Sequence, residues 1–411
     1  MSNRFYSRSL ELHRERQGKW EMRSRFPLET RDDLSVAYTP GVAAVSENIA
    51  KHPDAAFSMT LKGNSVAIVS DGSAVLGLGN IGPKAALPVM EGKAVLFKEF
   101  AGIDGVPLVV DAQSAEQLIE VVKAVAPTFG GINLEDIAAP KCFLVEEALQ
   151  DIGIPVFHDD QHGTAIVLLG ALINAAKLTG KRLEDLKVVI NGAGAAGTAI
   201  ARLLRCVGHD PDLCVPVRDI YVCDTKGIVS AKRKDLNPQK RELLLFTNRD
   251  DRSGTVYDAL QGADVFIGVS KADLLKAEHV RSMAPDPIIF AMANPVPEIM
   301  PDIAKSAGAA VVGTGRSDLP NQVNNVLAFP GVFRGALDAR APRITESMKL
   351  AAAYALANAV DKVAEEHILP DALDRSIAYV VAEAVKKAAA EGNKESTNGK
   401  RRAEGPLADV F

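Results

Sequence analysis

One stretch of sequence decides the fold of this chain: Lys187-Val188-Val189-Ile190-Asn191-Gly192-Ala193-Gly194-Ala195-Ala196-Gly197-Thr198-Ala199-Ile200-Ala201-Arg202-Leu203-Leu204. Its apolar start predicts a strand, its glycines a tight turn and its end a helix, which is the order of a dinucleotide-binding unit. Gly192 permits the turn, Gly194 lets the backbone approach a pyrophosphate, and Gly197 lets the helix pack closely on the strand. The free N–H groups of the helix N-terminus attract the anion. We therefore predict a dinucleotide site at Gly192, Ala193, Gly194, Ala195, Ala196 and Gly197. A glycine turn that only packs a helix on a strand is the alternative.

The strand predicted at 220–223 ends at Asp224, which we expect to bind the ribose hydroxyls of the dinucleotide. Asp224 follows Gly192 by 32 positions (224 minus 192), more than the roughly 20 of the common fingerprint, because a longer loop intervenes at 208–218. An aspartate here favours NAD, since it repels the 2′-phosphate of NADP. Lys226 stands two residues later and is able to bind that phosphate, so the choice between NAD and NADP stays open.

Short apolar runs alternate with helical patterns on both sides of this stretch. Strands are predicted at 66–69, 106–110, 132–134, 154–157, 186–191, 220–223, 265–269, 288–292 and 310–312, and helices at 114–125, 141–149 and 164–178. This rhythm is typical of an α/β fold with parallel sheets. We predict an N-terminal α/β domain for the substrate at 1–160 and a doubly wound, Rossmann-type dinucleotide-binding domain at 161–340.

The two ends of the chain differ from this pattern. The first thirty or so residues are charged, with Trp20 as a lone anchor, and are expected to form a helix and an arm. Alanine-rich amphipathic helices are predicted at 346–366 and 369–390, within a segment (341–392) that packs across both domains. The polar tail at 393–411 is expected to be mobile.

Acidic residues follow two of the predicted strands. Glu135 and Asp136 come after the strand at 132–134, and Asp159 and Asp160 follow the strand at 154–157. Crowded carboxylates raise one another's pKa unless a cation neutralises them, so their convergence at one sheet edge indicates a hard divalent ion. A helix N-cap is the alternative for Asp159. A metal beside a nicotinamide indicates oxidation of a hydroxy acid.

Composition sets wide bounds on function. The chain has 411 residues, 47% hydrophobic and 24% charged, with a net charge of -5, which fits a globular protein of two domains. This net negative charge does not indicate the excess of basic residues that binds nucleic acid or an anionic membrane. The basic run at 231–234 is therefore predicted to be a solvated loop. The N-terminus lacks the pattern of a secretory signal, and the apolar stretch at 164–176 is too short to span a membrane.

The four cysteines are predicted to be reduced. Cys142, Cys206, Cys214 and Cys223 lie in apolar surroundings without CxxC spacing, so core thiols are favoured over disulfides or zinc ligands. A cytoplasmic location fits best.

Several motifs together resemble those of malic enzyme in its compact bacterial form, over about 32–335. They are Tyr38-Thr39-Pro40-Gly41-Val42, Ser70-Asp71-Gly72-Ser73, Gly77-Leu78-Gly79-Asn80, Glu91-Gly92-Lys93, Asp159-Asp160-Gln161-His162-Gly163-Thr164 and Ala293-Asn294-Pro295. The resemblance implies oxidative decarboxylation of L-malate to pyruvate and carbon dioxide, with NAD or NADP and with Mg²⁺ or Mn²⁺.

The resemblance also implies the chemical roles of six residues. Glu135, Asp136 and Asp160 would be the metal ligands, with Asp159 behind them or toward the cofactor. Lys93 would take the proton of the C2 hydroxyl, and Tyr38, held near the lysine, would protonate C3 of the enol. His158 and His162 flank the acidic pair, but hard ions seldom need imidazole, so orienting or packing roles are expected.

Three further residues are expected to bind substrate or cofactor. Asn294 and Asn325 offer amides to the substrate carboxylate and to the carboxamide of the cofactor. Larger relatives carry an arginine after the Asp-Gly step, where this chain has Ser73-Ala74. Ser73, with nearby backbone amides, is the substitute that the resemblance to compact forms favours for binding the second carboxylate of malate.

Two other functions stay open. A malolactic-type enzyme would convert malate to lactate with tightly held NAD, and a dinucleotide-sensing protein would keep the fold without turnover. The terminal segments offer surfaces for a homodimer or a higher homo-oligomer, of which twofold dimers are the commonest kind.

Overall fold

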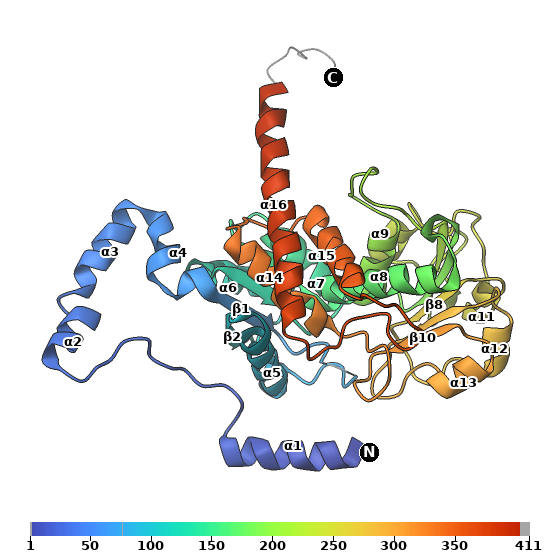
Figure 1. Ribbon diagram of the computed structural model, residues 1–411, viewed down its shortest axis with the longest axis horizontal. Coiled ribbons are helices and arrows are strands. Elements are labelled where there is room, and N and C mark those ends of the chain that lie inside the picture. The colour runs from blue at the N-terminus through green and yellow to red at the C-terminus, as the bar shows by residue number, and fades with distance from the viewer. Residues whose placement is uncertain (1, 76, 403–411) are drawn as a thin grey trace.

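The N-terminal half contains a parallel sheet of order β2-β1-β3-β4 in the computed structural model, which describes residues 2–75 and 77–402 (Figure 1). Its strands are β1 (Ser65–Ser70), β2 (Asp104–Val109), β3 (Gly131–Leu134) and β4 (Val156–His158). β1, β3 and β4 are buried along their whole length, as parallel strands covered on both faces are. The associated helices are α5 (Pro83–Ala101), α6 (Ala115–Val125) and α7 (Lys141–Leu149).

The second half contains a six-stranded sheet of order β10-β9-β8-β5-β6-β7. Its strands are β5 (Lys187–Asn191), β6 (Asp219–Asp224), β7 (Gly227–Ile228), β8 (Val265–Gly268), β9 (Ile288–Ala291) and β10 (Val311–Thr314). All pairs are parallel except β6 with β7. The chain builds outward from β5 to β7 and then returns to place β8 on the other side of β5. The strand order therefore reverses between β5 and β8, where such sheets bind ligands.

Short helices connect these strands. They are α9 (Ala195–Leu204), α10 (Pro238–Leu243), α11 (Val256–Leu260), α12 (Ala277–Arg281) and α13 (Pro301–Ser306). The predicted α/β class, with a doubly wound sheet in the second half, is confirmed. The predicted strands all occur within a few residues of their expected bounds.

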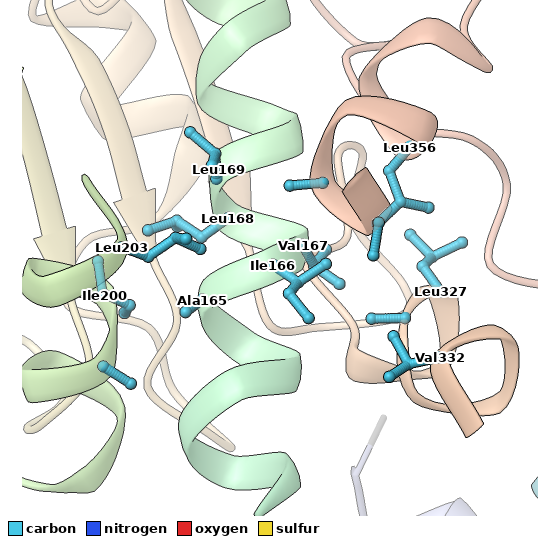
Figure 2. Packing of buried hydrophobic residues seen from close by; sticks show 14 of the residues in the cluster. Ala165, Ile166, Val167, Leu168, Leu169, Ile200, Leu203, Leu327, Val332 and Leu356 are labelled. Atoms are coloured by element: carbon cyan, nitrogen blue, oxygen red, sulfur yellow. The ribbon is translucent and has the colours of Figure 1, made fainter. Parts of the chain in front are cut away.

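The helix α8 (Asp159–Thr179) links the two sheets and runs through the core. Figure 2 shows Ile200 and Leu203 of α9 on one side of it, and Leu327, Val332 and Leu356 on the other. Among the described residues α8 alone is long and apolar enough to span a membrane, but 72% of its most apolar window is buried inside the protein. The helix is thus longer than the apolar stretch in the sequence suggests, and it is a core helix.

The C-terminal helices pack back on both halves, as predicted. α14 (Phe329–Asp338) places Phe329 and Phe333 edge-on against Phe97 of α5, and α15 (Glu346–Asn358) packs beside α8. α16 (Ser376–Arg402) packs against α14 and α15. α15 ends earlier and α16 begins later than predicted, since Pro370 disfavours helix at Leu369 and Asp374 caps the N–H of Ser376 at 2.9 Å. The predicted tail is helical to Arg402, and 403–411 lie outside the described residues.

The N-terminal segment forms an arm that extends away from the two sheets (Figure 1). Its helices are α1 (Ser2–Arg16), α2 (Arg31–Ala37), α3 (Val42–Lys51) and α4 (Ala56–Met59). The predicted helix and arm are confirmed, but Trp20 is 39% exposed and does not anchor a core. Large apolar side chains are exposed along this arm: Phe5, Tyr6, Leu10, Met22, Phe26, Leu28, Leu34, Val36, Val42 and Val45.

The cysteine prediction is half right. Cys142 and Cys223 are buried free thiols, whereas Cys206 and Cys214 form a disulfide with their Cα atoms 5.8 Å apart. The connection after α9 folds back on itself and brings these two residues together. Pattern reasoning based on CxxC spacing does not detect this loop.

Candidate active site

Three elements bring Lys93 and the acidic residues to one edge of the N-terminal sheet. Lys93 lies on α5, Glu135 follows β3, and Asp159 and Asp160 form the first turn of α8. The acidic pair therefore belongs to the start of the helix, where negative side chains favour the helix dipole. His158 occupies the N-cap position without a capping side-chain bond, so the N-cap alternative for Asp159 is wrong.

Lys93 is buried and held by two carboxylates. Its Nζ lies 2.5 Å from Asp159 Oδ2, 2.9 Å from Glu135 Oε1, and 4.1 Å from the centre of the Phe329 ring. Asn325 Nδ2 donates to the same Asp159 oxygen at 3.1 Å. Burial alone would lower the pKa of Lys93, but the charges of Asp159 and Glu135 raise it well above its ordinary value. The lysine is thus held protonated in this arrangement.

The acidic cluster has more negative charge than Lys93 neutralises. Burial and the nearby carboxylates of Asp160, Asp159 and Asp136 raise the pKa of Glu135, and burial raises that of Asp159. Lys93 Nζ contacts two of these carboxylates, those of Glu135 and Asp159, and Asp159 Oδ1 is buried without a hydrogen-bond partner. A divalent cation is the counter-charge that such oxygens select.

The predicted metal ligands Glu135, Asp136 and Asp160 are neighbours, but their carboxylate oxygens do not surround one position that an ion could occupy. Asp160 Oδ2 accepts from the backbone N–H of Asp136 at 2.8 Å, and Glu135 Oε2 accepts from Asn133 Nδ2 at 2.9 Å. Within residues 2–75 and 77–402, no group of three acidic, histidine or cysteine side chains is gathered for an ion. The donor set fits a hard cation in charge and chemistry, and rotation of these carboxylates is needed to coordinate one.

Ser73 joins two loops beside this cluster. Its hydroxyl donates to Asp71 Oδ1 at 2.6 Å and accepts from the Ala138 N–H at 2.9 Å. Lys141 Nζ pairs with the other oxygen of the Asp71 carboxylate. Lys141 is a cation that sequence reasoning missed, because a lysine at the start of a helix carries no distinguishing pattern.

Two histidines border the acidic pair. His158 is fully buried, with Nδ1 3.8 Å from Asp160 Oδ2. His162 Nε2 lies 2.8 Å from Glu146 Oε1, behind the cluster. Glu146 is also buried and accepts from the N–H of His158 at 3.2 Å. These contacts tie the start of α8 to Glu146 of α7.

Tyr38 does not lie near Lys93 within this chain. It is the C-cap of α2 on the arm and is 67% exposed. Figure 1 shows α2 well separated from α5, which carries Lys93. The expected proximity of the phenol to the lysine is therefore absent within one chain.

The glycine-rich turn has the geometry expected of a dinucleotide crevice. Gly192 has φ of 129°, and a side chain there would collide with Val269 at the end of β8. A Cβ on Gly197 would lie 1.8 Å from the Gly192 carbonyl oxygen. Gly194 is exposed and is the N-cap of α9, and the position where a Cβ would lie is open space. Turn, close packing and open backbone thus occur where the sequence predicts them. Ala195 and Ala196 form the first turn of α9, and Ala193 lies in the turn itself.

Asp224 ends β6, as predicted, but it has two cationic partners. Arg233 Nη1 and Nη2 contact its two oxygens at 2.8 and 2.9 Å, and Lys240 Nζ lies 2.5 Å from Oδ2. These partners lower the pKa of Asp224 to about 2, although burial opposes them. The prediction of a wholly solvated basic loop is wrong for Arg233, which reaches back because β7 reverses the chain. Lys226 pairs with Asp235 at 3.0 Å instead.

Asn294 follows the C-terminal end of β9, in the sheet that also contains β6, and is exposed. A side chain on Gly77 would meet its carbonyl oxygen at 2.9 Å, and one on Gly315 would meet Nδ2 at 2.7 Å. The Asn294 loop therefore touches a loop of the N-terminal half. Asn325, which begins a short 3-10 helix (Asn325–Leu327), contacts Asp159 as described above. Both amides thus lie where the two halves of the chain meet.

Comparison with known proteins matches both halves of the chain. Residues 17–150 match the malic enzyme N-terminal domain, and residues 161–390 match the malic enzyme NAD-binding domain. The chain belongs to the malic enzyme family. Family members are NAD(P)-dependent oxidoreductases that decarboxylate malate, so the predicted class of activity is confirmed and the non-catalytic alternative is not retained.

The relatives include proteins named NAD-dependent malic enzyme and proteins named NADP-dependent malic enzyme, the latter in Halomonas elongata at 46% identity over 91% of this chain and 90% of its own length. The bifunctional malic/malolactic enzyme of Bacillus subtilis is 55% identical over 93% of this chain and 92% of its own length. The NAD-dependent malic enzyme of Geobacillus stearothermophilus is 54% identical over 90% of this chain and 77% of its own length. The crystal structure of the NAD-dependent malic enzyme of Thermotoga maritima has a TM-score of 0.87 and 48% identity, covering 92% of this chain and 98% of that chain.

Substitution of Lys93 tests its place in this malic enzyme site. We expect Lys93→Ala to lower kcat by about 10²-fold to 10⁴-fold, the usual contribution of an acid–base group, while the Kd for NAD(P)H stays near the wild-type value. Turnover and fluorescence titration of the reduced cofactor measure these two quantities.

The matched control is Lys98→Ala. Lys98 lies on the same helix, but it is exposed and pairs with Asp104 at 2.7 Å, so its variant should be active. A fully active Lys93→Ala enzyme would show that the lysine is not part of the chemistry.

Proposed function

We propose that this protein oxidises L-malate to pyruvate and carbon dioxide with reduction of NAD⁺ or NADP⁺. The observation that carries the proposal is the buried Lys93 between Glu135 and Asp159, at the N-terminus of the helix that leads to the dinucleotide-binding sheet. The amine can exchange a proton with a substrate hydroxyl there once its two ion pairs loosen. We also propose the division at 160/161 and a cytoplasmic location.

Glu135, Asp136 and Asp160 would hold a Mg²⁺ or Mn²⁺ ion, with Asp159 beside them against Lys93. When bound, a divalent ion supplies polarisation of the substrate oxygens and balances negative charge. Lys93 would accept the proton of the C2 hydroxyl, and a bound nicotinamide would supply the acceptor for the hydride of C2. Because its ion pairs hold Lys93 protonated, it acts as a base only when Glu135 and Asp159 bind it less tightly.

Substrate orientation falls to polar side chains at the junction of the two halves. We propose that Asn325 and Asn294 donate to the malate carboxylate and to the cofactor carboxamide. Asn325 already donates to Asp159, which supports a place beside the reacting carbon. Ser73 would hold the second carboxylate, and Lys141 is the nearby cation that supports an anion there.

Once C2 is oxidised, loss of the C4 carboxylate as carbon dioxide would leave the electron pair of the C3–C4 bond in an enol. Tyr38 would donate a proton to C3 of this enol, and we propose that it does so in the site of a second copy of this chain. Its phenol is exposed on an arm that carries many exposed apolar side chains, and such surfaces mark protein interfaces. A twofold dimer with exchanged arms would cover these side chains and bring one chain's Tyr38 to the other chain's Lys93.

Complementation between two inactive variants tests this dimer. Tyr38→Phe and Lys93→Ala each lose activity, but their mixed dimer contains one site with an intact tyrosine and an intact lysine. Co-expression should restore roughly a quarter of wild-type activity if partners pair at random. If the tyrosine serves its own chain, no mixture regains activity. Light scattering of the wild type provides the independent measurement of mass.

The surroundings of Asp224 support use of NADP as well as NAD. Arg233, Lys240 and Lys226 surround two carboxylates, those of Asp224 and Asp235, so positive charge is in excess there. A 2′-phosphate would meet this excess charge. We propose that Lys240 leaves Asp224 to bind the phosphate.

Replacement of Lys240 should separate the two cofactors. A charged hydrogen bond contributes about 1.5 kcal/mol or more, so Lys240→Ala should raise the KM for NADP roughly tenfold while changing that for NAD little. Lys234→Ala is the control, because Lys234 is an exposed lysine next to Arg233 in the sequence. Equal changes in both KM values would contradict this role of Lys240.

A steady-state assay tests the function itself. We expect malate to yield pyruvate and an equal amount of NAD(P)H, and we expect EDTA to stop the reaction until Mn²⁺ or Mg²⁺ is restored. The name of the Bacillus subtilis relative supports a second candidate, conversion of malate to lactate. Lactate without net NAD(P)H would favour that candidate, and absence of both products would refute the proposed function.

A further inference from the structure

Glu298 is a fully buried carboxyl that the reaction described above does not use. It lies in the loop after β9 and is 0% exposed. Its Oε2 accepts from the N–H of Ala293 at 3.0 Å, and its Oε1 accepts from the N–H of Ser270 at 3.4 Å. One side chain therefore joins the loop after β8 to the loop after β9.

These two loops form one side of the proposed nicotinamide site. β8 is the neighbour of β5 at the point where the strand order reverses, and Val269 packs against Gly192. Ala293 precedes Asn294, whose carbonyl is close to Gly77 of the N-terminal half. A change in the spacing of these loops moves Asn294 relative to the glycine-rich turn.

The carboxyl of Glu298 also needs the glycine at position 268. A Cβ on Gly268 would lie 2.2 Å from Glu298 Cδ, so any side chain there would displace the carboxyl. The backbone of the Glu298 loop adds two further bonds to the loop after β8: Leu275 N–H to Glu298 O at 2.9 Å, and Asp273 N–H to Pro297 O at 3.1 Å. The side chain is thus the inner part of a clamp between the loops.

A buried carboxyl is a costly way to join two loops. Burial raises the pKa of Glu298, and backbone N–H groups oppose that shift. Within the described part of the chain, no cationic side chain forms a salt bridge with Glu298. A packing role alone would be served by an apolar side chain, which has no desolvation cost. The two convergent acceptors instead fix two N–H groups at a set separation.

We propose that Glu298 is a positioning residue that sets the distance between the glycine-rich turn and Asn294, and thereby the approach of the nicotinamide to C2 of the substrate. The proposal rests on the proposed function. It concerns the nicotinamide half of the crevice and leaves the adenosine half at Asp224 unaffected.

Kinetic isotope effects on variants of Glu298 test the proposal. Glu298→Ala should lower kcat roughly tenfold or more, because small misplacements of reacting atoms slow transfer strongly. Slower hydride transfer limits the rate more fully, so the primary isotope effect with malate deuterated at C2 should rise above the wild-type value. The inhibition constant of ADP-ribose, which lacks the nicotinamide, should stay within about twofold. Glu298→Gln keeps one acceptor oxygen, so its kcat and its isotope effect should lie between those of the wild type and those of Glu298→Ala.

Two further variants keep the test decisive. Gly268→Ala keeps the glutamate at position 298, but the added methyl group displaces its carboxyl. This variant should therefore reproduce the raised isotope effect. Asn174→Ala removes a buried amide of α8 that donates to Ala357 O and Ile368 O and contacts neither of the two loops. It should lower Tm without changing the isotope effect.

An unchanged isotope effect in Glu298→Ala and Gly268→Ala, or a parallel loss of ADP-ribose affinity, would overturn the positioning role. If the wild type itself forms no NAD(P)H from malate, the proposed function fails first.

Discussion

The contact on which the site depends is the ion pair of Lys93 with Glu135 and Asp159. Each partner comes from a different element, and all three are buried. A buried charge that loses its partner costs several kcal/mol, so the fold has to bring the three elements together accurately. The same pairing leaves the surrounding carboxylates with excess negative charge. One arrangement thus fixes the amine and creates the demand for a cation.

The architecture explains how this contact is maintained beside a cofactor site. α8 begins at the acidic pair and passes through a core shared by both sheets, so the acidic turn is attached to a rigid element. Phe329 of α14 packs against the Lys93 amine, which couples the C-terminal helices to the site. Asn325 and Asn294 sit where the halves meet. Small shifts between the halves would therefore alter the substrate and nicotinamide contacts proposed for these two amides together.

Patterns among residues close in sequence predicted many of the strands and helices of this molecule. The strand, turn and helix around Gly192 occur as expected because glycine conformation and apolar periodicity are local properties, and α7 spans the predicted residues. Pairing across long sequence distances was not predictable. Lys93 and Asp159 are 66 positions apart, and Arg233 reaches Asp224 only because β7 turns the chain back. The place of Tyr38 and the Cys206–Cys214 disulfide likewise depend on how loops and arms fold in space.

Anomalous diffraction from crystals soaked with Mn²⁺ is the most direct measurement of the central claim. The account predicts one strong peak coordinated by carboxylate oxygens of Glu135, Asp136 and Asp160, with Lys93 no longer bound to Glu135. A saturating soak that leaves the Lys93–Glu135 pair intact, with no peak at the acidic cluster, would contradict it.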